Sequence, residues 1–171
     1  RIVAGSGAKL AHVVSTAARE GLAGLEQLVG IPGTIGGALH GNAGTHGGDI
    51  GQFTRRAQVL TRGGDRITRE SDDLHFAHHQ SSLDELVILD AEFELEPEDP
   101  QVIARRMQTL WIVKRAGEPT GSEGVGRMFQ DPRGGSASEL IEQSGLKGTR
   151  CGNVEISSAN ATFFIVHPGG T

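Results

Sequence analysis

A helical pattern of apolar residues occupies the first part of the chain. Between residues 8 and 20, apolar side chains recur at the spacing of one helix face, at Leu10, Val13, Val14, Ala17 and Ala18. Residues three and four positions apart lie on the same side of an α-helix, and the glycine that follows, Gly21, is typical of a helix end. The pattern predicts an amphipathic helix that packs on a sheet.

The clearest strand pattern lies at residues 87–95. Apolar residues occupy every second position there, and acidic residues stand between the later ones; the apolar set is Val87, Leu89, Ala91, Phe93 and Leu95. This period of two predicts a half-buried strand. Upstream, residues 57–60 and 66–68 flank Gly63-Gly64-Asp65, which predicts a hairpin.

A proline-rich acidic segment, residues 96–100, ends this strand and predicts a boundary between two domains, 1–97 and 98–171. Asp99 and Pro100 are typical of a helix start, and a helix of about 15 residues is expected to follow. Its apolar face comprises Ile103, Met107, Leu110 and Trp111. The basic residues off this face form either a solvated surface or contacts to a phosphate group; they are Arg105, Arg106, Lys114 and Arg115.

The last part of the chain predicts a short helix and two strands. Ser136 and Glu139 have the spacing of a capping box, and Gly145 is expected to close the helix that they open. Strands are expected around residues 154–157 and 162–166. The order of helix, strands, helix and strands predicts an α+β fold with a mixed or antiparallel sheet.

Residues 24–48 hold nine of the chain's 26 glycines. Glycine is costly in regular structure, so this density indicates either a tight crossing of turns or a cradle that a ligand approaches closely. The segment matches neither the dinucleotide fingerprint nor the P-loop. Its backbone N–H groups are candidates for an anion-binding concavity around a diphosphate. Apolar residues threaded through the segment exclude a flexible linker.

Composition narrows the function classes. The net charge is −5 and the basic residues form no long run, which disfavours a nucleic-acid surface. A single cysteine, Cys151, excludes an internal disulfide framework. No apolar run approaches the length of a membrane span and no signal peptide is visible, so we expect a cytoplasmic protein without membrane contact. The chain starts at Arg1 in a strand-like pattern, which indicates a fragment of a longer protein.

Seven histidines raise the question of a metal site. His75, His78 and His79, with His40 and His46, supply enough imidazole for a zinc-dependent hydrolase. No HExxH or CxxC motif accompanies them, so ordinary surface or hydrogen-bonded histidines are the preferred interpretation and no metal is expected.

Several motifs in order resemble one enzyme family. Residues 21–26 (GLAGLE), 30–38 (GIPGTIGGA) and 42–44 (NAG) are followed at matching spacing by FQDP at 129–132 and LIEQSGLKG at 140–148. Together they closely resemble the UDP-N-acetylenolpyruvoylglucosamine reductase (MurB) family. The resemblance covers nearly the whole chain.

The resemblance implies a vanillyl-alcohol-oxidase-type FAD-binding region, continued here by residues 1–97, and an α+β domain for a UDP-sugar at 98–171. Such enzymes pass hydride from NADPH through FAD to UDP-N-acetylglucosamine enolpyruvate in peptidoglycan synthesis. The resemblance assigns cofactor contacts to Ile31, Pro32, Gly33, Thr34, Gly36, Gly37, Asn42, Gly44 and Ile88, and substrate contacts to Gln130 and Asp131.

Two catalytic positions of the family carry other residues here. His79 stands where the family has an arginine that stabilises the developing enolate, and Arg127 stands where it has a proton-donating serine. A guanidinium stays protonated near neutrality and cannot give up its proton. The substitutions favour reduced or absent family activity, or another substrate whose carboxylate or phosphate pairs with Arg127. The alternative function is a non-catalytic relative that binds flavin, a UDP-sugar or a protein partner.

The same resemblance places the family's amino-terminal flavin subdomain before Arg1 and a late catalytic glutamate beyond Thr171. If the first strands are cut off from neighbours, their unpaired edges are expected to promote a homodimer.

Overall fold

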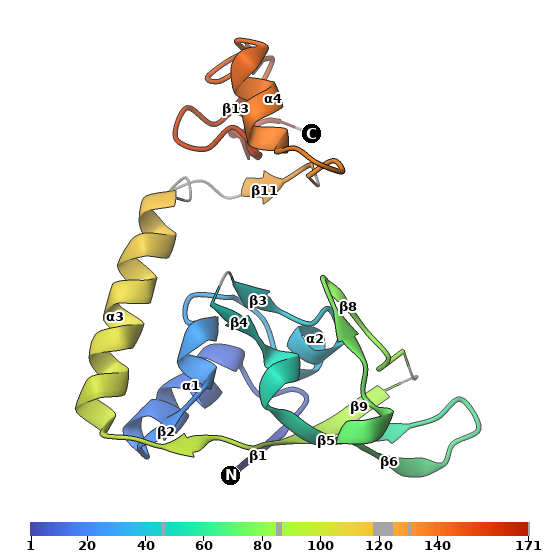
Figure 1. The fold of residues 1–171 in the computed structure, drawn as a ribbon. Coiled ribbons are helices and arrows are strands. Elements are labelled where there is room, and N and C mark those ends of the chain that lie inside the picture. The colour runs from blue at the N-terminus through green and yellow to red at the C-terminus, as the bar shows by residue number, and fades with distance from the viewer. Residues whose placement is uncertain (46, 85–86, 118–124, 130, 171) are drawn as a thin grey trace. The chain divides into compact units, whose positions relative to one another are not determined.

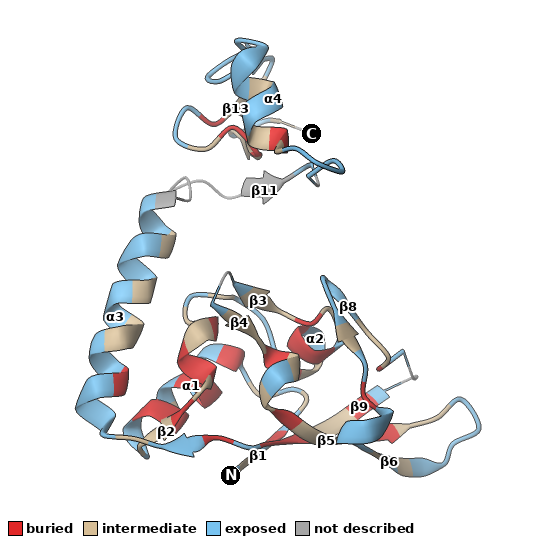
Figure 2. Ribbon diagram, viewed as in Figure 1, coloured by how far each residue is buried: buried red, intermediate tan, exposed pale blue. Residues whose placement is uncertain are grey.

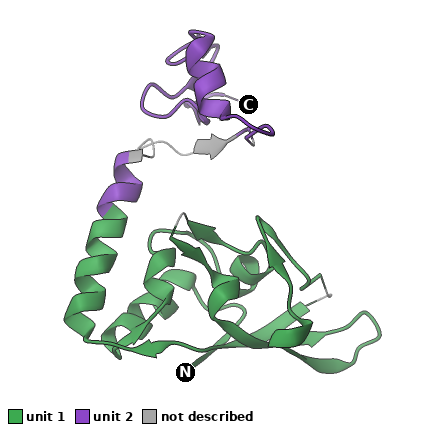
Figure 3. Ribbon diagram, viewed as in Figure 1, with its two compact units in different colours: residues 1–111 green, residues 112–171 purple. Residues whose placement is uncertain are grey.

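The computed structural model describes residues 1–171 except 46, 85–86, 118–124, 130 and 171, and describes only the backbone of 117 and 125–127. The chain forms two compact units, residues 1–111 and 112–171 (Figure 3). Within the described part of the chain, no helix combines the length and the apolar character that a membrane crossing requires.

Unit 1 is built on a four-stranded antiparallel sheet (Figure 1). Its strands are β1 (Ile2–Gly5), β9 (Val87–Phe93), β5 (Thr54–Leu60) and β6 (Arg66–Glu70), in that order across the sheet. The predicted hairpin is confirmed, because β5 pairs with β6 from Arg56↔Glu70 to Leu60↔Arg66. β5 begins earlier than the pattern indicates, at Thr54.

The strand predicted at residues 87–95 exists, but its alternation is interrupted. Gln58 pairs with Asp90 and Val59 with Ile88, so Leu89 is an extra residue in β9. This β-bulge turns Ile88 into the core and leaves Val87 41% exposed, whereas the pattern places Val87 and Leu89 inside. Beyond the bulge, Ala91 and Phe93 point inward as predicted.

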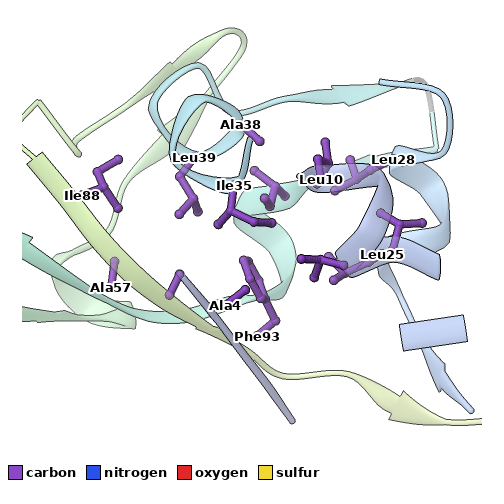
Figure 4. Packing of buried hydrophobic residues seen from close by; sticks show 14 of the residues in the cluster. Ala4, Leu10, Leu25, Leu28, Ile35, Ala38, Leu39, Ala57, Ile88 and Phe93 are labelled. Atoms are coloured by element: carbon purple, nitrogen blue, oxygen red, sulfur yellow. The ribbon is translucent and has the colours of Figure 1, made fainter. Parts of the chain in front are cut away.

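Two α-helices and two short 3₁₀ helices supply the apolar side chains that pack with those of the sheet. They are α1 (Leu10–Arg19), η1 (Leu25–Leu28), α2 (Ile35–His40) and η2 (Ile50–Phe53). The predicted face of α1 is confirmed, since all five of its apolar residues are buried. Buried side chains concentrate on these helices and on β5 and β9 (Figure 2), and Phe93 lies fully buried in the same cluster as Leu10, Leu25 and Ile35 (Figure 4).

Short elements complete unit 1. Three small two-stranded ribbons pair β2 (Leu22–Ala23) with β10 (Glu96–Pro97), β3 (Gly44–Thr45) with β4 (Gly48–Asp49), and β7 (Phe76–Ala77) with β8 (Gln80–Ser81). A 3₁₀ turn, η3 (Ser71–Asp73), follows β6.

Helix α3 (Pro100–Gly117) begins where the sequence predicts, with the Asp99 side chain accepting a hydrogen bond from the Gln101 N–H at 2.8 Å. Ile103 on this helix is fully buried with Ala18 and Ala23. The compact units divide within α3, after Trp111, rather than after Pro97 as predicted. The reason is that the first turns of the helix pack on unit 1.

One basic residue of α3 is paired with two carboxylates of unit 1 although its side chain is 37% exposed. Arg106 donates to Glu26 at 2.5 Å and to both carboxylate oxygens of Glu98 at 2.8 and 2.9 Å. Hydrogen bonds to Glu98 and then to Glu26 raise the pKa of Arg106, so the guanidinium stays charged. Glu26, only 3% exposed, also accepts the Gly24 N–H. Arg106 is therefore committed to carboxylates of the protein, which disfavours the phosphate contact at this position.

Unit 2 contains a second antiparallel sheet in the order β11 (Val125–Arg127), β14 (Phe163–Val166), β13 (Val154–Ile156) and β12 (Arg150–Cys151). Helix α4 (Ala137–Gln143) lies between β11 and β12 in the chain. Ser136 caps this helix by accepting the Glu139 N–H, and Gly145 at φ +67° follows its end, as predicted. Helices and antiparallel strands in both units confirm the α+β class.

Candidate functional site

The glycine-rich segment folds around helix α2. After η1, the chain turns at Gly30 (φ +77°) and Gly33 (φ +118°), conformations that side chains rarely adopt. Thr34 then caps α2, its hydroxyl accepting the Gly37 N–H at 3.3 Å. The turn residues 30–34 and α2 together carry six of the nine residues to which the family resemblance assigns cofactor contacts.

Some of these glycines serve close crossings inside the protein. The Gly36 N–H donates to the Ser6 carbonyl at 2.8 Å, and a Cβ on Gly36 would lie 3.0 Å from the Ser6 Cβ. A Cβ on Gly24 would overlap the Phe53 ring, and one on Gly44 would lie 2.6 Å from the Asp49 Cβ. For these three positions, the tight crossing of turns is the correct interpretation.

Other glycines of the segment face open space. A Cβ on Gly33 would meet nothing within 4 Å, and one on Gly37 would meet only the Thr34 hydroxyl, at an ordinary 3.6 Å. Gly33, Gly37, Pro32 and Thr34 are exposed, and Ile31 is half-buried. We call residues 31–34 and 37 the open glycine surface. At Gly33 and Gly37 this surface presents backbone at the protein exterior, where a ligand can approach closely.

The predicted anion-binding role of the backbone N–H groups finds less support. At the start of α2, the N–H groups of Ile35 and Gly36 donate to the carbonyls of Ala8 and Ser6, at 2.9 and 2.8 Å. Gly37 donates to the Thr34 hydroxyl. These three donors thus have protein acceptors, so they are not free to bind a diphosphate at the start of α2.

Two predicted cofactor residues point inward. Ile88 is 9% exposed and belongs to the apolar core of unit 1. Asn42 is 5% exposed, and both ends of its amide are used within the protein. Its Nδ2 donates to the Ala77 carbonyl at 2.9 Å and its Oδ1 accepts the Gly51 N–H at 3.1 Å.

His79 lies in the two-residue turn between β7 and β8, exposed and at φ +55°. Its ring centroid is 4.1 Å from that of His78. Among the described residues, no three histidine, cysteine or carboxylate side chains are placed to share a metal ion, although His46 lies outside them. His40 is engaged instead with the Leu83 carbonyl, at 3.1 Å from its Nδ1.

The predicted substrate residues belong to unit 2. Arg127 ends β11 opposite Phe163, and only its backbone is described. Gln130 lies outside the described residues. Asp131 is exposed, and one of its oxygens accepts the Ala137 N–H at 2.8 Å, at the first residue of α4. This bond fixes the chain after β11 to the start of the helix.

A polar hollow of about 310 Å³ elsewhere in unit 1 includes none of the predicted site residues. Arg55 and Glu94, two residues of its lining, already form an ion pair at 3.3 Å. It therefore adds nothing to the site built from the glycine segment.

Comparison with known proteins identifies the class that this fold and site represent. Residues 118–171 match the family model described as the C-terminal domain of UDP-N-acetylenolpyruvoylglucosamine reductase. The whole chain is 43% identical over 171 residues to the reductase of that name from Rhodopirellula baltica. It is 41% identical over 172 aligned residues to the one from Listeria innocua. Along its whole length the chain is therefore similar to the UDP-N-acetylenolpyruvoylglucosamine reductase (MurB) family.

A solved structure agrees with this assignment. The crystal structure of the reductase from Thermus caldophilus superposes with a TM-score of 0.83 at 32% identity, covering 96% of this chain and 61% of that one. The chain covers 56% and 57% of the R. baltica and L. innocua proteins. It therefore spans little more than half the length of the curated relatives it matches.

Sequence reasoning missed the residues that hold the site in place. Glu26 and Arg106 are 80 positions apart, and Ser81 reaches the His40 carbonyl from 41 positions away. One signal was present for Glu26, an acidic residue between the apolar Leu25 and Leu28 of a short helix. No sequence pattern marks the bonds of Asn42 or Ser81.

Proposed function

We propose that this chain supplies part of the flavin surface and the sugar-nucleotide domain of a UDP-N-acetylmuramate dehydrogenase, with reduced or no activity of its own. The observation that carries the proposal is similarity along the entire chain, 43% over 171 residues, to a UDP-N-acetylenolpyruvoylglucosamine reductase. The matching segments include residues 30–38, which form the open glycine surface and the start of α2.

The residues present fit a flavin ring. A planar ring system needs a flat protein surface that it can approach closely, and Gly33 and Gly37 leave that space free. Bound FAD would supply hydride transfer from NADPH to the enolpyruvyl ether, and the protein would bind and orient both partners. Residues 31–34 and 37 would lie against the ring, whereas Gly36, Gly44, Asn42 and Ile88 would support that surface from beneath.

Unit 2 would hold the UDP-sugar. Asp131 is exposed, and one of its carboxylate oxygens anchors the chain to α4; the other would accept a hydrogen bond from a ligand. Arg127, at the end of β11, provides a permanent positive charge that suits a phosphate or carboxylate. Gln130, which the resemblance assigns to the substrate, would contribute an uncharged amide.

The catalytic positions favour weak turnover. Arg127 cannot act as the general acid, and His79 carries a full positive charge only when it is protonated. Losing a general acid costs a factor of about 10²–10⁴ in rate. A non-catalytic binding protein is the second candidate, favoured by the change of both positions together.

The test is a pair of titrations on the 171-residue chain, with FAD followed by flavin fluorescence and with UDP-N-acetylglucosamine followed by calorimetry. Binding of FAD supports the flavin surface, and binding of the sugar nucleotide supports the role of unit 2. If the chain folds and binds neither, the proposal is wrong for this chain. If both bind, NADPH oxidation with the enolpyruvyl substrate, in the chain and in Arg127→Ser, separates the weak enzyme from the binding protein.

A further inference from the structure

The β7–β8 ribbon that carries His79 is too short to hold its own shape. Each strand has two residues, and His78 and His79 form the turn between them. An isolated two-stranded hairpin is at best marginally stable in water, even when its strands are longer. The position of this turn must therefore come from contacts with the rest of unit 1.

Asn42 provides the contact nearest to the turn. Its Nδ2 donates to the carbonyl of Ala77, the residue directly before His78, at 2.9 Å. Its Oδ1 accepts the Gly51 N–H at 3.1 Å, and a Cβ on Gly51 would overlap the Phe76 ring. One amide thus binds β7 directly and also fixes the backbone on which the aromatic ring of β7 rests.

The opposite strand of the ribbon is held from the same end of α2. The Ser81 hydroxyl donates to the His40 carbonyl at 2.9 Å, and the His40 ring lies 3.1 Å from the Leu83 carbonyl through Nδ1. His40 is the last residue of α2, and Asn42 follows it by two positions. Both strands of the ribbon are therefore tied to the helix whose outer side carries Gly37.

Asn42 is also suited to this place by its backbone. Its φ of +42° lies in the left-handed region, which asparagine tolerates better than other side chains. Aspartate has the same shape and a similar tolerance but lacks the amide donor. Glycine accepts the φ without strain and lacks the whole side chain. A comparison of asparagine, aspartate and glycine at this position therefore distinguishes the effect of the side-chain hydrogen bonds from the effect of the backbone conformation.

We infer that Asn42 is a positioning residue, which sets the His78–His79 turn relative to the open glycine surface and does not itself bind a ligand. The importance of His79 for a flavin or substrate rests on the proposed function. The role of Asn42 in fixing the turn does not, because every contact that carries it lies within the protein. This assignment replaces the cofactor contact that the resemblance implies for Asn42.

The experiment compares Asn42→Asp and Asn42→Gly with the parent chain by NMR of the histidine ring protons and the Gly51 amide. The resonances of His78 and His79 are assigned through His78→Gln and His79→Gln. We expect Asn42→Asp to shift both ring signals, because the carboxylate faces the Ala77 carbonyl without a donor, while the Gly51 amide keeps its protection from exchange. Asn42→Gly is expected to shift the ring signals and to lose Gly51 protection as well.

Asn153→Asp in unit 2 is the matched control, since it makes the same chemical change at a residue whose Oδ1 accepts a hydrogen bond from Arg150, at 3.4 Å, and which lies in the other unit. If Asn42→Asp folds and leaves the His78 and His79 signals as unchanged as Asn153→Asp does, the inference is wrong. If Asn42→Asp does not fold, Ser81→Ala tests the anchoring of the ribbon from strand β8. Unchanged His78 and His79 ring signals in Ser81→Ala would contradict the inference that α2 anchors both strands.

Should the parent chain bind FAD, Asn42→Asp is expected to weaken that binding about fivefold, the size of one lost hydrogen bond. Failure of FAD binding in the parent chain counts against the proposed function alone.

Discussion

The two units bury very different side chains. In unit 1 the fully buried residues include many large apolar side chains, among them Phe93, Leu10 and Ile35. In unit 2 the buried side chains, among the described residues, are small or polar: Ala137, Ala161, Ser157 and Thr162. Removal of apolar surface from water is the main favourable contribution to folding, at about 25 cal/mol per Å².

The difference means that the interior of each unit is stabilised by a different kind of interaction. Unit 1 has an apolar core of its own. In unit 2, the Ser157 hydroxyl accepts the N–H groups of Ala159 and Asn160, and Asn160 in turn accepts both the N–H and the hydroxyl of Thr162. A hydrogen-bonded turn of this kind fixes a shape but adds little net stability per bond. We therefore expect unit 2 to open at lower denaturant than unit 1.

The largest effect is expected from the core of unit 1. Phe93→Ala removes a fully buried ring and is expected to lower the free energy of unfolding by about 3–5 kcal/mol. Phe164→Ala in unit 2 removes a half-buried ring that contacts Phe129 edge-on, and should cost less than about 2 kcal/mol. Hydrogen exchange along a urea series, read on peptides from each unit, measures both. Equal losses in the two variants would contradict the comparison.

A second prediction concerns the buried carboxylate under α3. Glu26→Ala leaves the Gly24 N–H without its acceptor and is expected to cost about 1–3 kcal/mol. Glu98→Ala, at a partly exposed carboxylate, should cost under about 1 kcal/mol. Glu26→Gln keeps an acceptor for Gly24 and should fall between the two. Thermal unfolding of the three variants tests this order of stability losses. A larger loss of stability in Glu98→Ala than in Glu26→Ala would contradict the prediction.

A third prediction compares two neighbouring glycines of α2: Gly36, which packs against Ser6, and Gly37, which faces open space. Gly36→Ala puts a methyl group 3.0 Å from the Ser6 Cβ and should destabilise by about 1–3 kcal/mol despite the better helix propensity of alanine. Gly37→Ala meets only ordinary contact and should be neutral or stabilising by up to about 1 kcal/mol.

If the open glycine surface binds FAD, Gly37→Ala should nevertheless weaken that binding, because the methyl group projects from it. Urea unfolding and FAD titration of the same samples distinguish the two effects. A Gly37→Ala protein with improved stability and unchanged flavin affinity would exclude Gly37 from the flavin surface.

The smallest effects are expected at the helix caps. Thr34→Ala and Ser136→Ala each remove a capping hydroxyl and should cost about 1 kcal/mol. The Thr34 cap holds a helix packed in the core, so its loss should show in global unfolding. The Ser136 cap holds α4, most of whose surface is exposed (Figure 2), so its loss should show only as faster local exchange in α4. Circular dichroism melts and amide exchange give the two readouts.

Local patterns in the sequence predict most of the elements. The spacing of Leu10 to Ala18 predicts α1, Gly63-Gly64-Asp65 predicts the turn between β5 and β6, and Ser136 predicts the start of α4. Each of these depends on residues close together in the chain, which is why the sequence shows them.

What the sequence does not reveal depends on distant partners. The bulge at Leu89 arises from pairing with β5, about 30 positions earlier, and it reverses the sides of Val87 and Ile88. Arg106 looks like a surface charge until Glu26 is brought beneath it. Gly36 and Gly37 are adjacent and identical in sequence, and only the position of Ser6 shows that one is needed for packing and the other is not.

The bulge in β9 also limits how the length of the chain can change. It directs the Leu89 carbonyl to the Ser6 N–H at 2.9 Å, and the Ser6 carbonyl in turn accepts the Gly36 N–H at 2.8 Å. A single deleted residue at this point would keep every apolar side chain needed for the core, yet it would break the link from the sheet to α2. At Gly64, on the tip of the β5–β6 hairpin, a Cβ would meet nothing within 4 Å. Natural insertions and deletions in this lineage should therefore collect at that tip and avoid residues 88–90.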